Sequence, residues 1–204
     1  MADLPAFTAT DGDGTPLTDE ELRGLLLPVL TRADLDRAEA DNITRARVQV
    51  LGGRRRPLSV VLTQRWMCRL HRRMFDEVWS WAGTLRRTDR NIGVEPWRIG
   101  PELKVLIDDV TFWAADTGPF AMPGDEVCVR LSHRAVQIHP FANGNGRWSR
   151  LLADVAATAL DRPVFSWGGS ALRSADDTRR AYLEALRVAD RALDYQPLLT
   201  FARS

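Results

Sequence analysis

Apolar residues recur at helical spacing through most of this chain, and this periodicity restricts its fold more than any other feature. Between residues 63 and 78, for example, Trp66, Leu70 and Met74 fall on one face of a helix. His71 lies in the same stretch, and we interpret it as a histidine of the core or its rim rather than a catalytic one. Further helices are expected to begin near Thr18 and Thr31 and to cover residues 101–115, 125–138, 147–160 and 174–189.

Residues 83–100 lack this period. They contain Gly83, Asn91-Ile92-Gly93 and Pro96, a pattern typical of a short two-stranded flap. The first ~15 residues favour a flexible lead-in, and residues 52–57 favour a loop. In that loop Arg54-Arg55-Arg56 fits a solvated turn better than a nucleic-acid patch. The predicted fold class is therefore all-α, a helical bundle with one small β-hairpin flap.

Length and charge exclude several classes of protein. The 204 residues suit one domain with at most a short appendage. Lys and Arg total 28 against 27 Asp and Glu, so binding to nucleic acid by phosphate neutralisation is not expected. The start of the chain lacks a signal peptide, no apolar run is long enough for a bilayer, and Cys68 and Cys128 form no CxxC pair. We expect a soluble cytoplasmic protein with no membrane partner.

The segment from His139 to Arg150 has the features of an anion site. Gly144 and Gly146 allow close approach of a ligand to the backbone, and a helix is expected to begin directly after them. Arg147 and Arg150, three residues apart, share one face of its first turn and can reach the same phosphate chain. Two positive charges at a helix N-terminus interact unfavourably with the helix dipole, and an anion bound between the two arginines would offset this cost.

His139 stands at the edge of this loop and titrates near neutral pH, so it could accept a proton from an attacking hydroxyl. A rival interpretation makes His139 a helix C-cap and the loop a connector. The combination of a histidine, Gly-Asn-Gly and two spaced arginines favours the functional interpretation.

Residues 139–150 closely resemble the HxFx(D/E)GNGRxxR signature of the Fic (Fido) family, and they depart from it in one slot. Residues 79–86 and 182–198 are also similar to the family, so the likeness covers roughly 60–201. It is greatest to the branch labelled mobile mystery protein B, whose members tend to carry Asn where this chain has Asn143. The resemblance implies an N-terminal helical extension over 1–58 and a Fic domain over 59–204.

Most studied Fic proteins move AMP from ATP to a hydroxyl side chain of a target protein, so the resemblance implies an adenylyltransferase with ATP as donor. His139 would be the base, and Phe141 would pack inward. Arg147 and Arg150 would hold the distal phosphates. The phosphate cradle would be Gly144, Asn145 and Gly146, and the flap that aligns the target would be Thr88, Asp89, Arg90, Asn91, Ile92, Gly93 and Val94.

Asn143 is the one departure from the signature. The family has Asp or Glu here, which helps to hold Mg²⁺, and a neutral amide is a poorer ligand for that ion. The resemblance therefore implies a weakened magnesium site, with transfer that is slow, uses another donor or is lost. The alternative function is a degenerate Fic fold that binds a nucleotide or a partner without turnover.

Many Fic proteins carry an inhibitory [S/T]xxxE[G/N] motif. This chain has no Ser or Thr with Glu four positions later, and Thr15 to Asp19 is the nearest approach. We therefore expect any restraint to come from a separate, antitoxin-like regulatory protein or from a degenerate N-terminal helix.

Overall fold

The computed structural model describes residues 18–28, 31–115, 121–169 and 174–204. The lead-in expected before residue 16 lies outside these residues. The described chain is helical apart from its loops and one isolated bridge between Leu25 and Trp79. The helices are α1 (Asp19–Leu22), α2 (Arg32–Leu51), α3 (Leu58–Val61), α4 (Gln64–Phe75), the 3₁₀ turn η1 (Pro96–Arg98), α5 (Ile99–Trp113), α6 (Gly124–Ile138), α7 (Asn145–Ala159), α8 (Ala175–Ala192) and α9 (Gln196–Arg203).

The capping residues begin the helices where the sequence predicts. Thr18 and Thr31 each accept a bond from the third backbone amide of their helix, and Glu21 and Asp34 return a bond to the cap. Thr63 and Ser174 cap α4 and α8 in the simpler way. The sequence analysis missed two short helices, α3 and α9.

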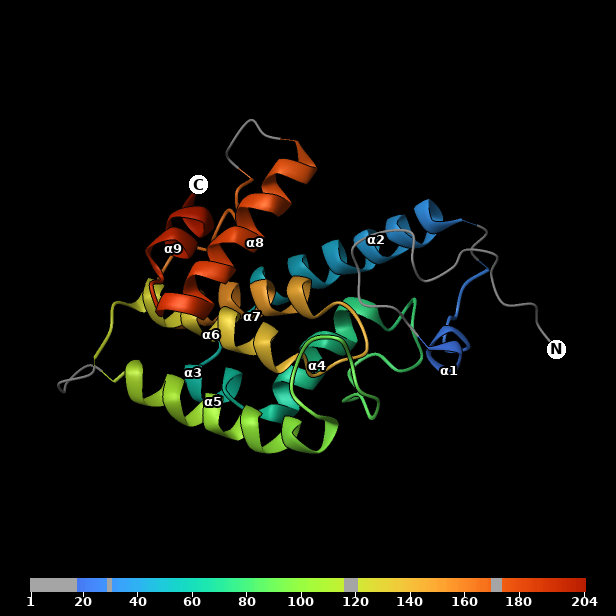
Figure 1. Ribbon diagram of the computed structural model, residues 1–204, viewed down its shortest axis with the longest axis horizontal. Coiled ribbons are helices and arrows are strands. Elements are labelled where there is room, and N and C mark those ends of the chain that lie inside the picture. The colour runs from blue at the N-terminus through green and yellow to red at the C-terminus, as the bar shows by residue number, and fades with distance from the viewer. Residues whose placement is uncertain (1–17, 29–30, 116–120, 170–173) are drawn as a thin grey trace.

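Helices α6 and α7 form the centre of the bundle. They pack against each other, while α5 and α9 cover α6 and α2, α3 and α4 cover α7 (Figure 1). Most of the buried side chains of both central helices are apolar, Leu131, Ile138, Leu152 and Val155 among them. Helix α2 also contributes Leu35 and Val50 to this core, so the helix lies within the bundle. The predicted domain boundary at residue 58 stays a prediction.

The predicted β-hairpin flap is not present. Residues 84–95 are described throughout and form an irregular loop without a strand. The reason is the buried Arg86, whose guanidinium donates to the carbonyls of Thr88, Val94 and His139. These bonds fix the loop in an irregular course, in which its backbone forms no ladder. In the described residues, no helix combines the length and apolar character that a membrane span requires.

Candidate active site

The loop between α6 and α7 is fixed by two residues in left-handed conformation. His139 ends α6 with φ 54° and ψ 59°, and Gly144 precedes α7 with φ 78° and ψ 5°. A Cβ on Gly144 would lie 2.4 Å from the Phe75 ring of α4. Both the backbone angle and this contact therefore require glycine, and they hold the start of α7 against α4.

Two buried side chains close this loop from inside. Asn145 accepts a bond from the Phe141 amide at 2.9 Å through Oδ1 and donates to the Phe141 carbonyl at 2.8 Å through Nδ2. Phe141 points inward, as the resemblance implies, and stacks on His71 with ring centroids 3.8 Å apart. The side-chain amide of Asn145 is thus bonded within the loop, whereas the backbone N–H of Asn145 lies at the start of α7.

His71 supports the loop from α4. Its Nδ1 accepts from the Gly83 amide at 2.9 Å, so its Nε2 is the donor to the Asn143 carbonyl at 3.0 Å. Complete burial lowers the pKa of His71 to about 3, which keeps the ring neutral. The interpretation of His71 as a core histidine is confirmed. Its bond to Asn143 joins residues 72 positions apart, and no local pattern in the sequence signals it.

His139 is neutral at physiological pH. It is 5% exposed, and burial, reinforced by the positive charges of Arg86 and Arg90, lowers its pKa to about 4. A neutral imidazole is the form that can accept a proton. Bound phosphate would raise this pKa, because an anion favours the imidazolium.

These two histidines make stability depend on pH. Unfolding returns the pKa of His71 and His139 from about 3 and about 4 to near 6.5, so the unfolded chain binds more protons between about pH 4 and 6.5. The free energy of unfolding should fall as pH falls through that window, by about 1.4 kcal/mol per pH unit for each histidine. Urea unfolding at several pH values measures it. His139→Asn should reduce the slope, and an equal slope in both proteins would contradict the buried neutral state.

The flap loop is anchored directly on His139. Arg86 donates to the His139 carbonyl at 2.6 Å, and the Val94 amide donates to the Ile138 carbonyl at 3.3 Å. Gly93, with φ 100°, lies so close that a Cβ there would be 2.6 Å from the Cβ of His139. The structure therefore places the predicted flap residues beside the predicted base, although as an irregular loop.

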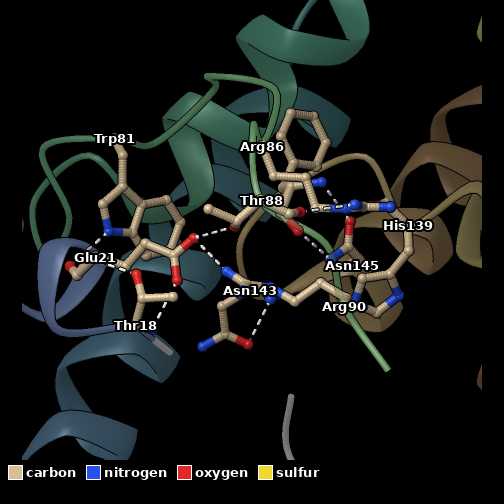
Figure 2. A network of polar contacts seen from close by, with 11 residues as sticks. Thr18, Glu21, Trp81, Arg86, Thr88, Arg90, His139, Asn143 and Asn145 are labelled. Carbon is tan, nitrogen blue, oxygen red and sulfur yellow. Dashed lines mark hydrogen bonds and ion pairs between the residues drawn. The ribbon is translucent and has the colours of Figure 1, made fainter. Parts of the chain in front are cut away.

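Helix α1 holds the outer side of this loop. The Glu21 carboxylate pairs with Arg90 and accepts from the Thr88 hydroxyl at 3.3 Å, while the Trp81 indole donates to the Glu21 carbonyl at 3.0 Å (Figure 2). The side chains of Arg90 and Glu21 are only 4% and 13% exposed. Sequence reasoning missed Glu21, Trp81 and Arg86, because the residues that they contact are distant in the chain or lie in an irregular loop.

The first turn of α7 keeps its positive end open. No side chain caps it, and no acidic residue occupies the turn. Gly146 faces open space, since a Cβ there would meet no atom within 4 Å. The amides of this turn can therefore receive an anion.

Arg147 is engaged by a residue that the sequence did not suggest. It pairs at 2.7 Å with Glu39 of α2, a carboxylate only 1% exposed that also accepts from the Trp79 indole at 2.6 Å. The Arg147 side chain remains one-third exposed and lies over the Phe75 ring. Arg147 is thus held in place by a buried counter-charge.

Arg150 has no such ion pair within the described residues, and its guanidinium lies 5.0 Å from the centre of the Tyr182 ring. Burial lowers its pKa most, and Arg147 lowers it further, while Tyr182 and Asp154 act in the opposite direction. A partly buried cation without an ion pair favours binding of an anion.

The residues near Asn143 do not fit a magnesium site made by the protein. The amide oxygen of Asn143 accepts from the Gly144 amide at 2.6 Å, and the described part of the chain holds no cluster of three His, Cys, Asp or Glu that could bind a metal. Mg²⁺ prefers anionic oxygen ligands. We therefore derive no step through a protein-held metal.

A family model and several solved structures match this chain. Residues 61–157 match the model of the Fic/DOC family. Fic-1 (residues 134–508) from C. elegans is similar with 22% identity and a TM-score of 0.60, over 89% of this chain and 50% of that one. This chain thus spans half the length of that relative. Comparison with curated proteins gives no match.

Two Bartonella structures are similar over most of both chains. BepC from Bartonella tribocorum, with bound AMPPNP, has 15% identity and a TM-score of 0.66, over 91% of this chain and 97% of that one. The N-terminal Fic domain of a Bartonella quintana Bep effector, with bound ADP, has 17% identity and a TM-score of 0.64, over 86% of each chain. These likenesses show that the chain has the Fic fold, and residues 61–157, a little under half of the chain, match the Fic/DOC family model.

Proposed function

We propose that this protein transfers AMP, or a related phosphate-linked group, from a nucleotide such as ATP to a hydroxyl side chain of a target protein. The Fic family is known for transfers of this kind. One observation carries the proposal to this chain. A neutral His139 precedes the uncapped N-terminus of α7, and Arg150, which has no ion pair in the described residues, lies in the second turn of that helix, so a proton acceptor and an anion site adjoin one another in the chain.

The proposed reaction is a displacement at the α-phosphorus. The target hydroxyl oxygen forms a bond to that phosphorus, its proton passes to His139, and the bond to the bridging oxygen breaks so that pyrophosphate leaves. The amides of Asn145 and Gly146 would neutralise charge on the phosphates, and Arg150 would hold the distal ones. Positioning and charge neutralisation would thus supply most of the rate.

Arg147 would act from a fixed position. Its pair with Glu39 sets its rotamer before a ligand arrives, and the one-third exposed guanidinium keeps donors available. The same pair weakens the attraction between Arg147 and a bound phosphate, because Glu39 already compensates part of the positive charge of the arginine. Arg150 is therefore proposed as the stronger of the two phosphate contacts.

The flap would align the target. Asn91, Ile92 and Gly93 are exposed at the tip of the loop that contacts His139, and Ile92 is 52% exposed. We propose that a target segment adds to this loop through its backbone, so that its hydroxyl reaches His139. A loop fixed at both sides by Arg86 and Arg90 presents a constant surface for this contact.

A binding module without turnover is the second candidate, and Asn143 is the observation that favours it. ATP labelled in its α-phosphate, incubated with this protein and a cell lysate, distinguishes the two. Label on a protein band that is absent with the His139→Asn variant supports transfer. ATP affinity in calorimetry without any labelled band would support the binding module instead.

Asn143→Asp tests the place where this chain leaves the family signature. A carboxylate should provide the anionic ligand that Mg²⁺ prefers and lower the Mg²⁺ concentration for half-maximal activity. The uncapped start of α7 tolerates the added negative charge. The measurement is transfer, or ATP affinity if no target is known, titrated with Mg²⁺. Identical titrations of the two proteins would mean that residue 143 does not contact the metal.

We further propose that the protein belongs to the branch labelled mobile mystery protein B, acts in the cytoplasm, and is restrained by a separate antitoxin-like protein. The basis for the last point is the missing [S/T]xxxE[G/N] motif. Its nearest approach, Thr15 to Asp19, begins outside the described residues.

A further inference from the structure

A cavity of about 590 Å³ lies away from the α6–α7 loop, between the end of α2, the 52–57 loop, α4 and the end of α7. Its volume is within the range of small-molecule sites, roughly 300–1,000 Å³. Apolar side chains, Trp66 and Leu70 among them, contribute to its wall. Five arginines line it as well: Arg54, Arg55, Arg56, Arg69 and Arg73.

Most of this positive charge is uncompensated. Arg55 pairs with Asp161 and donates to the Ala159 carbonyl at 2.8 Å, and Arg56 donates to the Val50 carbonyl at 3.2 Å. The other three, Arg54, Arg69 and Arg73, have no ion pair within the described ranges. Among the residues that the structure describes, no aspartate or glutamate is part of the cavity wall.

The spacing of the arginines on α4 destabilises this helix. Arg65, Arg69 and Arg73 follow one another at i, i+4 spacing, and the first turn of α4 contains no acidic residue. Like charges at this spacing destabilise a helix by about 0.2–0.5 kcal/mol per pair, and a cation near the N-terminus adds to the cost. A bound anion would reverse both effects.

The cavity is distinct from the candidate active site. At about 100° per residue, Arg69 and Arg73 fall on the side of α4 opposite to His71 and Phe75, which contact the α6–α7 loop. Ala159, which lines the cavity, is the last residue of α7, whereas the active-site loop precedes the first. The two sites can therefore be altered separately.

We propose that this cavity binds a small molecule that carries two linked phosphate groups. Guanidinium forks match phosphate oxygens in pairs, and two clusters of arginines, one on the loop and one on α4, converge on one cavity. The volume of about 590 Å³ and the net charge of +1 favour a small ligand over a nucleic acid, which requires an extended basic surface. The apolar wall would contact the uncharged part of the molecule.

Calorimetric titration of the full chain with sodium pyrophosphate tests the site. The Arg150→Ala variant weakens the phosphate site proposed at α7, and the part of the remaining binding that depends on Arg69 and Arg73 reports on the cavity. In that background the double substitution Arg69→Gln and Arg73→Gln should weaken pyrophosphate binding roughly a hundredfold, about tenfold for each charge-assisted hydrogen bond that is removed. The substitution Arg65→Gln is the matched control, because it removes an arginine of the same helix that does not line the cavity.

Thermal unfolding without ligand provides a second measurement. Removing Arg69 and Arg73 relieves like-charge repulsion, so the double variant should have an equal or higher Tm than the parent. In the Arg150→Ala background, pyrophosphate should raise the Tm of the protein that keeps Arg69 and Arg73 more than it raises the Tm of the double variant. Equal pyrophosphate affinity in the double variant and the Arg65→Gln control would overturn the proposal. So would a single-stranded oligonucleotide whose affinity rises with its length and exceeds that of pyrophosphate, since this would indicate a nucleic-acid surface.

Discussion

Replacing His139 by Asn is expected to lower the rate of transfer about 10²–10⁴-fold, the usual range for loss of a general base, and to change ATP affinity little. The imidazole would act on the target hydroxyl rather than on the phosphates. Asn is the better substitution than Ala because residue 139 has φ 54°, a conformation that Asn adopts more readily. The measurement is incorporation of the α-phosphate label under single-turnover conditions.

The structure provides the control for this result. Arg86 bonds to the main-chain carbonyl of residue 139, so the substitution leaves the anchor of the flap loop in place. His71→Asn, in contrast, removes a bond to the loop from the opposite side and should act mainly through stability. A His139→Asn protein with wild-type turnover would exclude His139 as the base.

Arg150→Ala should weaken binding of ATP about 10–150-fold, which corresponds to one charge-assisted hydrogen bond of about 1.5–3 kcal/mol. AMP should lose much less affinity, because the proposed contact is with the distal phosphates. Without nucleotide the variant should be as stable as the parent or more so, since the described residues give Arg150 no ion pair and burial disfavours its charge. Calorimetry with ATP and AMP and urea unfolding measure these effects.

Arg147→Ala offers the informative comparison. This substitution leaves the buried Glu39 carboxylate without its ion-pair partner, so it should reduce the free energy of unfolding by about 1–3 kcal/mol. The loss should be smaller than for a fully buried pair, because the Arg147 side chain is one-third exposed. Arg37→Ala, at an exposed position of α2, controls for the loss of one positive charge. Equal losses of ATP and AMP affinity in Arg150→Ala would contradict the placement of this arginine at the distal phosphates.

The helices and the loop that carries the chemistry could be predicted because their causes are local. Thr18, Thr31 and Ser174 cap helices through residues three positions away, and Gly144 begins α7 through its own backbone freedom. The prediction of a β-hairpin failed because the bonds of Arg86 fix the loop in an irregular course. Nothing within residues 83–100 indicates that this arginine would turn inward.

The sequence by itself determined an all-α chain with an anion-binding loop before a helix, since periodicity, caps and glycines act within a few residues. Only the tertiary structure decided which charges of that loop are compensated. It brought Glu39 to Arg147, left Arg150 without an ion pair in the described chain, and placed Glu21 on Arg90. It also brought Arg69 and Arg73 beside the 52–57 loop. Pairs of charges that are tens of residues apart meet only through packing of the helices, and burial then sets how strongly each pair acts.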